Sequence, residues 1–538
     1  MGLKRNQIPY QIVFWVSTIF ILALSLWKIR QGIGLKDEHF YAALGYRLWQ
    51  GDGLIADEWW MAQLMGFFVW PVVGVWRELV GSNDGIVWFY RLVYTFCTIL
   101  TGIHCFYRLK KWGKVESACL ASLLFMLFVP YNIPTLSYNT MGLLFMMNAL
   151  LCFEEKSKGR LFLSGFLYGC AVINSPFLAL GYFILLVVVA IKHFMSWKDF
   201  GVFTLGIVLI ALIFLGFLFS RASISSLLIG LQHVFDPSHS EGLLMRIIKN
   251  VGRFVLAYQI FAVLFIGELI VCLLLKNKKE NHEKFLLGSL VIHGLSLIWI
   301  IFLHPYSWEI GGHSLVLFPI AWFGLLLLIL KPSSWHVRFL FWVSVFYAAI
   351  LLISSNVGPV SYCNPLIIAS MMTIILIGDH YEGTWLSYLP YAFVCLLCVI
   401  RIFGYYGEPY RKEALVTKGP CKGLWDRNEV VKNYESIYED MQYLNSLPGE
   451  YAMFITNHTW EQVESNKKLG NDATYNYFWF KEDYIHYQEE YFHYHPDKTP
   501  LYIYLDEENP YDMKEDDPWL SQFKRIEKLN HGILFEKD

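Results

Sequence analysis

Long apolar segments alternate with short polar ones from the N-terminus to about residue 404. An apolar stretch of about 18 or more residues is typical of a helix that crosses a bilayer. The pattern predicts about thirteen such helices. They are expected near 10–29, 86–108, 115–130, 134–153, 161–173, 175–192, 200–220, 251–275, 284–303, 313–330, 336–353, 362–378 and 386–404. Only "NSP" divides 161–173 from 175–192, so one helix broken at Pro176 is the alternative there.

Basic residues occur in alternate connections between these segments. Lys or Arg is present in five of the six predicted inner connections, "LKKWGK", "EEKSKGR", "KHFMSWKD", "KNKKENHEK" and "KPSSWHVR", but not in the last, "GDHYEG". The predicted outer connections "VPYNIPTLSYN", "NSP", "HPYSWEIGGH" and "SSNVGPVSYCNP" contain neither residue. Cytoplasmic loops are enriched in Lys and Arg, and Lys4 and Arg5 precede the first apolar segment. We therefore expect a cytoplasmic N-terminus, an uncleaved first span and, after an odd number of spans, a C-terminal end outside the membrane.

Two long connections, 30–85 and 221–250, fall on the predicted outer side. Both contain amphipathic runs that are too polar to span a bilayer. Such runs are typical of short helices that lie along the membrane surface. In the first connection, a second surface helix is expected at 58–79, beginning at Asp57 and Glu58, because acidic residues favour a helix N-terminus.

The pattern changes after residue 404. "YESIYEDMQYLNSLP" has the spacing of an amphipathic helix, and "EYAMFITN", "TPLYIYLDEEN" and "HGILFEKD" have the composition of strands. Residues 405–538 are therefore predicted to form a small extracytoplasmic α/β domain. Residues 1–404 are predicted to form an all-α polytopic membrane module.

Composition agrees with a membrane protein. Hydrophobic residues make up 56% of the chain and charged residues 16%, and the mean hydropathy is +0.41. The net charge of −2 gives no basic field for nucleic acid. Most of the ten cysteines lie in apolar segments, which favours buried thiols over a disulfide framework.

The first acidic residues after the first span are Asp37 and Glu38. Asp37 precedes apolar positions at helical spacing, so a helix is expected to begin there. An aspartate at this place has two explanations. It can cap the helix, or it can be a catalytic carboxylate at the mouth of a membrane cavity.

The stretch "KDEHFYAALGYRLWQGDGLIADEWW" and its continuation to Arg91 resemble the start of a GT-C glycosyltransferase. These polytopic enzymes use polyprenyl-phosphate-linked sugars. The shared pattern is a first span, an early acidic pair, the turn "GDGLIAD", a second amphipathic helix and an Arg near the start of the next span. The layout of spans and outer tail is similar to the aminoarabinose- and mannose-transferring branches. The opening of the tail, "VTKGPCKGLW", is similar to tails of bacterial relatives.

The resemblance implies roles for the acidic pair. A carboxylate, Asp37 or its neighbour Glu38, would take the proton from an acceptor hydroxyl or orient it. The leaving group is a phosphate, so a cation near the membrane surface is expected to stabilise its charge. Arg91 could bind that phosphate. A buried Arg near the end of a span equally suits a structural partner of Asp37 or Glu38.

Other candidate substrate contacts are polar residues of the outer connections. Each also has an ordinary explanation as part of an interfacial turn. They are Glu58, His304, Glu309, His313, Asn356 and Tyr362. The second acidic residue of several GT-C members is missing, because "VPYNIPTLSYN" has no Asp or Glu. A divalent metal ion would have to recruit Glu58, Glu309 or a histidine, and metal ligands stay unknown.

The leading hypothesis is a multi-pass glycosyltransferase of the bacterial plasma membrane. It would move a sugar, with inversion, from a polyprenyl-phosphate donor to a glycan, lipid or protein acceptor at the outer face, among membrane lipids and without nucleic acid. One alternative is a polytopic transporter or flippase for lipid-linked or small solutes. Another is a non-catalytic membrane protein that binds cell-surface glycans.

Overall fold

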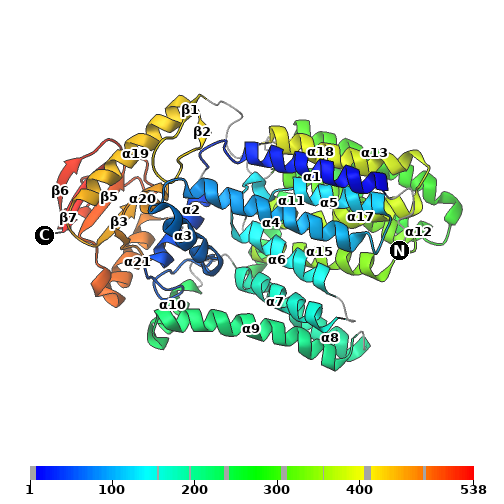
Figure 1. The fold of residues 1–538 in the computed structure, drawn as a ribbon, viewed down its shortest axis with the longest axis horizontal. Helices are drawn as coiled ribbons and strands as arrows, with labels where there is room; N and C mark the ends of the chain where they lie inside the picture. Colours follow the sequence, from blue (N-terminus) through cyan, green and yellow to red (C-terminus); the bar gives the residue numbers. More distant parts are fainter. Residues whose placement is uncertain are drawn as a thin grey trace.

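A computed structural model describes residues 8–34, 36–153, 157–192, 195–235, 242–303, 312–355, 357–404, 413–475 and 480–537. The molecule is elongated (Figure 1). Apolar helices fill one end, and the strands fill the other. Helices α2, α3 and α10 of the two long outer connections lie between them. The predicted arrangement of a helical module followed by a small α/β part is therefore present.

Each predicted apolar segment contains a helix. The helices are α1 (Ile8–Lys28), α4 (Ile86–Leu109), α5 (Val115–Leu127), α6 (Tyr138–Cys152), α7 (Lys158–Asn174), α8 (Ala179–Lys192), α9 (Trp197–Arg221), α12 (Ile260–Leu275), α13 (His282–Ile298), α14 (Leu317–Leu330), α15 (Trp335–Ser354), α17 (Leu366–His380) and α18 (Leu389–Phe403). Among the described residues, seven helices are long and apolar enough to span a membrane, or eight if one bent pair counts as a span. The figure of thirteen spans stays a prediction. At "NSP" the chain forms two helices, since α7 ends at Asn174 and α8 begins at Ala179.

The expected span at 251–275 is not one continuous helix. Its first part belongs to α11 (Leu243–Tyr258), which meets α12 at a bend of 97°. Gln259 at the bend has a positive φ of 51°. The amphipathic α11 and the short α10 (Ile224–Val234) account for the second long outer connection. Hydropathy did not reveal the break, because the sequence is apolar on both sides of Gln259.

Helix α17 lies at the centre of the apolar end. Every residue from Leu366 to Ile377 is buried, and α17 contacts α5, α14 and α15. A helix that is apolar on all sides suits such a position. On the flank, α7 packs closely against α9 at Gly165 and Gly206.

The first outer connection contains α2 (Lys36–Trp49) and α3 (Gly66–Val80). The predicted apolar face of α2 is confirmed, because Phe40, Tyr41, Leu44 and Leu48 are buried. The predicted start of the second helix at Asp57 and Glu58 is wrong. The helix begins eight residues after Glu58, at Gly66. The two carboxylates are instead engaged by cationic side chains from other segments.

The C-terminal part contains a five-stranded sheet in the order β4-β3-β5-β7-β6. Strand β3 (Tyr451–Ile455) is parallel to β4 (Lys468–Leu469) and β5 (Tyr502–Asp506), whereas β7 (Gly532–Lys537) is antiparallel to β5 and β6 (Phe523–Lys528). The predicted helix, α19 (Asn428–Ser446), and the three predicted strands are confirmed. Helices α20 (Trp460–Glu464) and α21 (Lys481–Tyr494), and a small pair of strands β1 (Ala414–Leu415) and β2 (Trp425–Asp426), were not predicted. All ten cysteines are free.

Candidate active site

A small pocket lies where the end of α1, the start of α2, the first turns of α4 and the end of α18 meet. Its lining includes three cationic side chains and one carboxylate. The lining residues are Lys28, Gln31, Gly34, Glu38, Arg91, Asn132, Ile133, Pro134 and Arg401. Among the described lining residues, the basic side chains outnumber the carboxylate, so this pocket suits an anionic group.

Glu38 and Arg91 form a buried ion pair. Arg91 donates from Nε to Oε1 of Glu38 at 2.7 Å and from Nη2 to Oε2 at 2.5 Å. Its remaining hydrogens go to the carbonyl oxygens of Ile29, Gln31 and Gly32. All five N–H donors of a guanidinium are thereby engaged. Of the two predicted roles, the structural partner of Glu38 is the one that this geometry matches.

Lys28 and Arg401 are the other basic side chains of the lining. Both are buried. The ammonium group of Lys28 donates to the carbonyl oxygens of Ile402 at 3.1 Å and Gly404 at 2.8 Å, which joins the end of α1 to the end of α18. Neither residue was predicted. The available signal was a charged residue at the end of an apolar segment, where charge is costly and often functional.

The connection between α5 and α6 forms one wall of the pocket. Tyr131 and Asn132 both have φ near 55°, which is unfavourable for residues with a side chain. Among the described residues, the side-chain amide nitrogen of Asn132 and both side-chain polar atoms of Gln31 are buried without a hydrogen-bond partner. Buried polar groups normally have partners. Local strain and unused amides at one pocket suit a site that binds a polar ligand.

Several predicted site residues fall outside the described part of the chain. They are His304, Glu309, Asn356 and the side chain of Asp37. The backbone of Asp37 lies in the first turn of α2, one residue before Glu38. Its assignment as the catalytic carboxylate stays a prediction.

His313 and Tyr362 lie outside the pocket. His313 is within hydrogen-bond distance of the carbonyl oxygen of Val129, 3.0 Å from Nε2. Tyr362 donates to the carbonyl oxygen of Asn250 at 3.2 Å. Both side chains therefore tie segments together near the outer connections, and their proposed substrate contacts stay predictions.

Glu58 lies at a different place, where it contacts Arg47 of the first outer connection and Thr474 of the C-terminal part. Its carboxylate is fully buried. It accepts from Nη1 of Arg47 at 3.0 Å and from the backbone N–H and hydroxyl of Thr474 at 2.9 and 2.5 Å. Burial raises the pKa of Glu58, and Arg47 opposes that shift. These partners give Glu58 a structural role.

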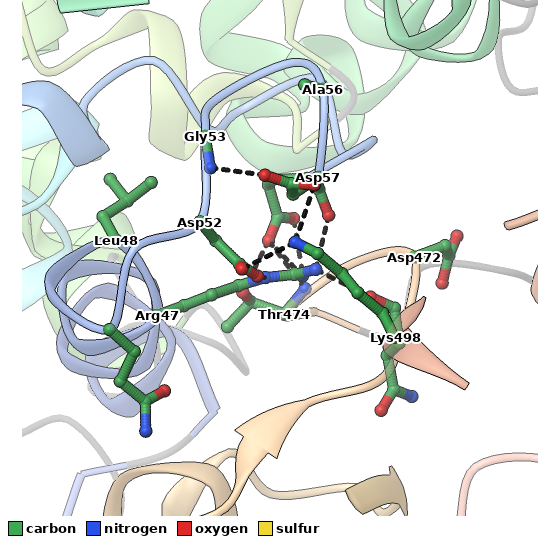
Figure 2. A network of polar contacts seen from close by, with 12 residues as sticks. Arg47, Leu48, Asp52, Gly53, Ala56, Asp57, Asp472, Thr474 and Lys498 are labelled. Atoms are coloured by element: carbon green, nitrogen blue, oxygen red, sulfur yellow. Dashed lines mark hydrogen bonds and ion pairs between the residues drawn. The ribbon is translucent and has the colours of Figure 1, made fainter. Parts of the chain in front are cut away.

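Arg47 and Lys498 extend this network (Figure 2). Arg47 donates from Nε to Asp52 at 2.7 Å and reaches the hydroxyl of Tyr491 at 3.1 Å. Lys498 lies 2.7 Å from carboxylate oxygens of both Asp52 and Asp57. Two cations thus neutralise carboxylates of the first outer connection, and they come from opposite sides of the interface.

The C-terminal part also contacts the start of α2. The backbone of Trp425 exchanges hydrogen bonds of 2.8 Å with Arg30 and Gly32, and Asp426 accepts from the N–H of Ile33 at 2.7 Å. Trp460 packs edge-on against His39, with ring centroids 5.0 Å apart. These contacts hold the turn before Asp37 in place. They join residues that lie far apart in the sequence, so no local sequence pattern predicted them.

A metal site is not apparent in the described part of the chain, where no three His, Cys, Asp or Glu side chains are grouped to hold an ion. Glu58, a predicted candidate, is instead surrounded by Arg47 and Thr474. A cation beside a carboxylate does not fit a metal ligand, because it occupies the oxygens that the metal would need.

No protein-family model matches the chain, and no curated protein matches it in sequence. Several solved structures are similar over most of its length, and they include the following two. One is the archaeal oligosaccharyltransferase AglB from Archaeoglobus fulgidus, in complex with an inhibitory peptide and a dolichol-phosphate (13% identity, TM-score 0.46, 92% of this chain and 69% of that chain). The other is ArnT from Cupriavidus metallidurans bound to undecaprenyl phosphate (11% identity, TM-score 0.43, 98% of both chains). At these identities and TM-scores the similarities do not assign an activity.

Proposed function

We propose that the protein is a membrane glycosyltransferase that moves a sugar from a polyprenyl-phosphate donor to an acceptor hydroxyl at the outer face of the membrane. One observation carries this proposal. Three buried cationic side chains converge on a pocket beside the first turn of α2, where Asp37 lies. A phosphate leaving group requires cations, and an acceptor hydroxyl requires a base. The pocket supplies the basic side chains, and we assign the role of the base to Asp37.

In the proposed step, the acceptor oxygen attacks the anomeric carbon of the sugar. The bond between that carbon and the donor phosphate breaks, and the configuration inverts. Asp37 takes the proton of the hydroxyl. The polyprenyl phosphate leaves with the electron pair, and Lys28 and Arg401 stabilise its negative charge.

Glu38 and Arg91 position this machinery. Their ion pair ties the first turn of α2 to α4 and to the turn at 29–32. Since the N–H groups of Arg91 are already engaged, we assign the phosphate to Lys28 and Arg401. Asn132 and Gln31 are placed to contact the sugar or the phosphate.

Residues 405–538 form the second unit in this proposal. They assist acceptor binding or cap the pocket, without catalysis of their own. The support is their contact with the turn before Asp37, through Trp425 and Asp426. Residues 1–404 hold the catalytic pocket.

The test compares Asp37→Asn with wild type in a deletion strain, with envelope glycans and lipids profiled by mass spectrometry. The donor and acceptor that this profile identifies are then used with purified protein. We expect transfer to fall by about 10²–10⁴-fold, as for loss of a general base. Undecaprenyl phosphate binding should be retained by Asp37→Asn and weakened by Arg401→Gln.

Near-normal turnover by Asp37→Asn would contradict the proposal. Glycans that keep their composition but remain on the cytoplasmic side in the deletion strain would instead indicate the flippase alternative. The 97° bend between α11 and α12 is the feature that favours that alternative. Transporters of this kind usually carry such broken helices in corresponding pairs, and within the described residues this is the one bent pair.

A further inference from the structure

A second, larger cavity lies on the outside of the helical bundle, between α1 and α4. Its volume is about 640 Å³, which is within the range of small-molecule sites, about 300–1,000 Å³. The lining residues are Leu26, Trp27, Arg30, Trp88, Leu92, Phe96 and Trp425. None of these residues lines the pocket at Glu38. The two cavities are therefore separate sites.

The cavity has the form of a groove along α4. Trp88, Leu92 and Phe96 are four residues apart and so follow one side of the helix over about 12 Å. Trp27 on α1 and Phe96 are 42% and 46% exposed, so the groove is open on its side. On an apolar helix pair, that side faces the bilayer. The groove thus suits a hydrocarbon chain that lies along the helices.

The outer end of the groove has a different character. Trp27, Trp88 and Trp425 come together there from three separate segments, and tryptophan prefers the boundary between lipid and water. Arg30 is the charged residue of the lining. Its guanidinium is exposed and lies 6.0 Å from the ring centre of Trp88. A guanidinium at this boundary is suited to bind a phosphate.

We propose that this groove binds an anionic glycerophospholipid of the surrounding bilayer. One acyl chain lies against Leu92 and Phe96, and the phosphate is bound by Arg30. No carboxylate is among the described residues of the lining, which argues against the sugar donor as occupant, because none of these residues could act as its base. Trp425 belongs to the C-terminal part, so the bound lipid also joins that part to α1 and α4.

The test uses the purified full-length protein in neutral detergent, by native mass spectrometry and thermal unfolding. Phosphatidylglycerol and phosphatidylcholine with the same acyl chains are compared. We expect one tightly held phosphatidylglycerol per chain and a rise in Tm that phosphatidylcholine does not produce. Arg30→Gln should weaken phosphatidylglycerol binding by about tenfold, the loss of one charge-assisted hydrogen bond. Arg338→Gln, at an exposed arginine on α15, is the matched control and should change nothing.

A second variant tests the apolar half of the groove. Leu92→Trp fills it and leaves Arg30 in place, so it should also lower phosphatidylglycerol binding. Equal binding by Arg30→Gln and wild type would overturn the proposal, as would equal binding of the two phospholipids. Displacement of phosphatidylglycerol by an equimolar amount of undecaprenyl phosphate would show that the groove holds the donor lipid instead.

Discussion

At the scale of single residues, the Glu38–Arg91 pair is the most consequential contact of the pocket. Glu38 is 1% exposed and Arg91 3% exposed, so removal of one partner leaves a buried charge without compensation. We expect Glu38→Gln to destabilise the protein by about 3–5 kcal/mol. Thermal unfolding in detergent measures the loss. The double variant Glu38→Gln with Arg91→Met should lose less than the sum of the two single variants, because the pair acts as a unit. Additive losses would show that the two side chains act independently.

Glu464 predicts a pH dependence in the C-terminal part. It is buried beside the hydroxyl of Tyr434, with Asp84 nearby, and burial raises the pKa of its carboxyl from 4.5 to about 8. Between pH 4.5 and about pH 8, the Glu464 carboxyl is protonated in the folded protein and ionised in the unfolded chain. Stability from this group is therefore fully present below pH 4.5 and declines as the pH rises towards about 8.

Glu464→Gln should remove this decline. The Tm of wild type relative to the variant should fall between about pH 5 and about pH 8. Glu439→Gln, at an exposed glutamate on α19, provides the control and should follow wild type at every pH. Parallel curves for wild type and Glu464→Gln would mean that Glu464 is ionised in the folded protein.

At the scale of helices, the pairing of α7 with α9 depends on small residues. A Cβ at Gly165 would lie 1.8 Å from the carbonyl oxygen of Phe203, and one at Gly206 would lie 2.2 Å from that of Phe162. Both neighbours are backbone atoms, so the helices would have to separate. We expect Gly165→Ala to cost about 1–3 kcal/mol, measured as a fall in Tm. Gly201→Ala on α9 is the control, because no described atom lies within 4 Å of its Cβ. It should be neutral or slightly stabilising. Equal effects of the two changes would contradict the close packing.

Elements with a strong local pattern were predictable from the sequence. Each apolar segment became helical, and α2 and α19 followed their amphipathic spacing. The failures have physical causes. The bend at Gln259 lies inside continuous apolar sequence, and Asp57 and Glu58 are engaged by cations rather than by a helix N-terminus. For the site, Glu38 and Arg91 were found from their positions beside a span. Lys28, Arg401 and Asn132 were missed because the fold brings them together from distant segments.

At the scale of the whole molecule, the buried network around Arg47 joins the first outer connection to the C-terminal part. Arg47 is 2% exposed and faces the carboxylates of Asp52 and Glu58. We expect Arg47→Met to cost about 3–5 kcal/mol, since both carboxylates would stay buried without it. Limited proteolysis should then release the C-terminal part more readily. Arg525→Met breaks an exposed pair with Glu515 and should cost about 1 kcal/mol or less. An unchanged cleavage pattern for Arg47→Met would show that other contacts suffice to hold the parts together.

The orientation of the molecule decides whether the pocket can face an extracytoplasmic acceptor. Basic connections on one side predict that the C-terminal part lies outside the cytoplasmic membrane. Two exposed lysines that are predicted to lie on opposite sides of the membrane can test this orientation. They are Lys524 on β6 and Lys278 in the connection between α12 and α13. Each is replaced by cysteine in a background in which the exposed Cys395 is alanine. On intact cells, a membrane-impermeant maleimide should label Lys524→Cys, and it should label Lys278→Cys only after lysis.

The opposite result would place the pocket end at the cytoplasmic face, and the proposed transfer at the outer face would then be wrong. Labelling of both sites only after lysis would place both parts inside and exclude the predicted odd number of spans.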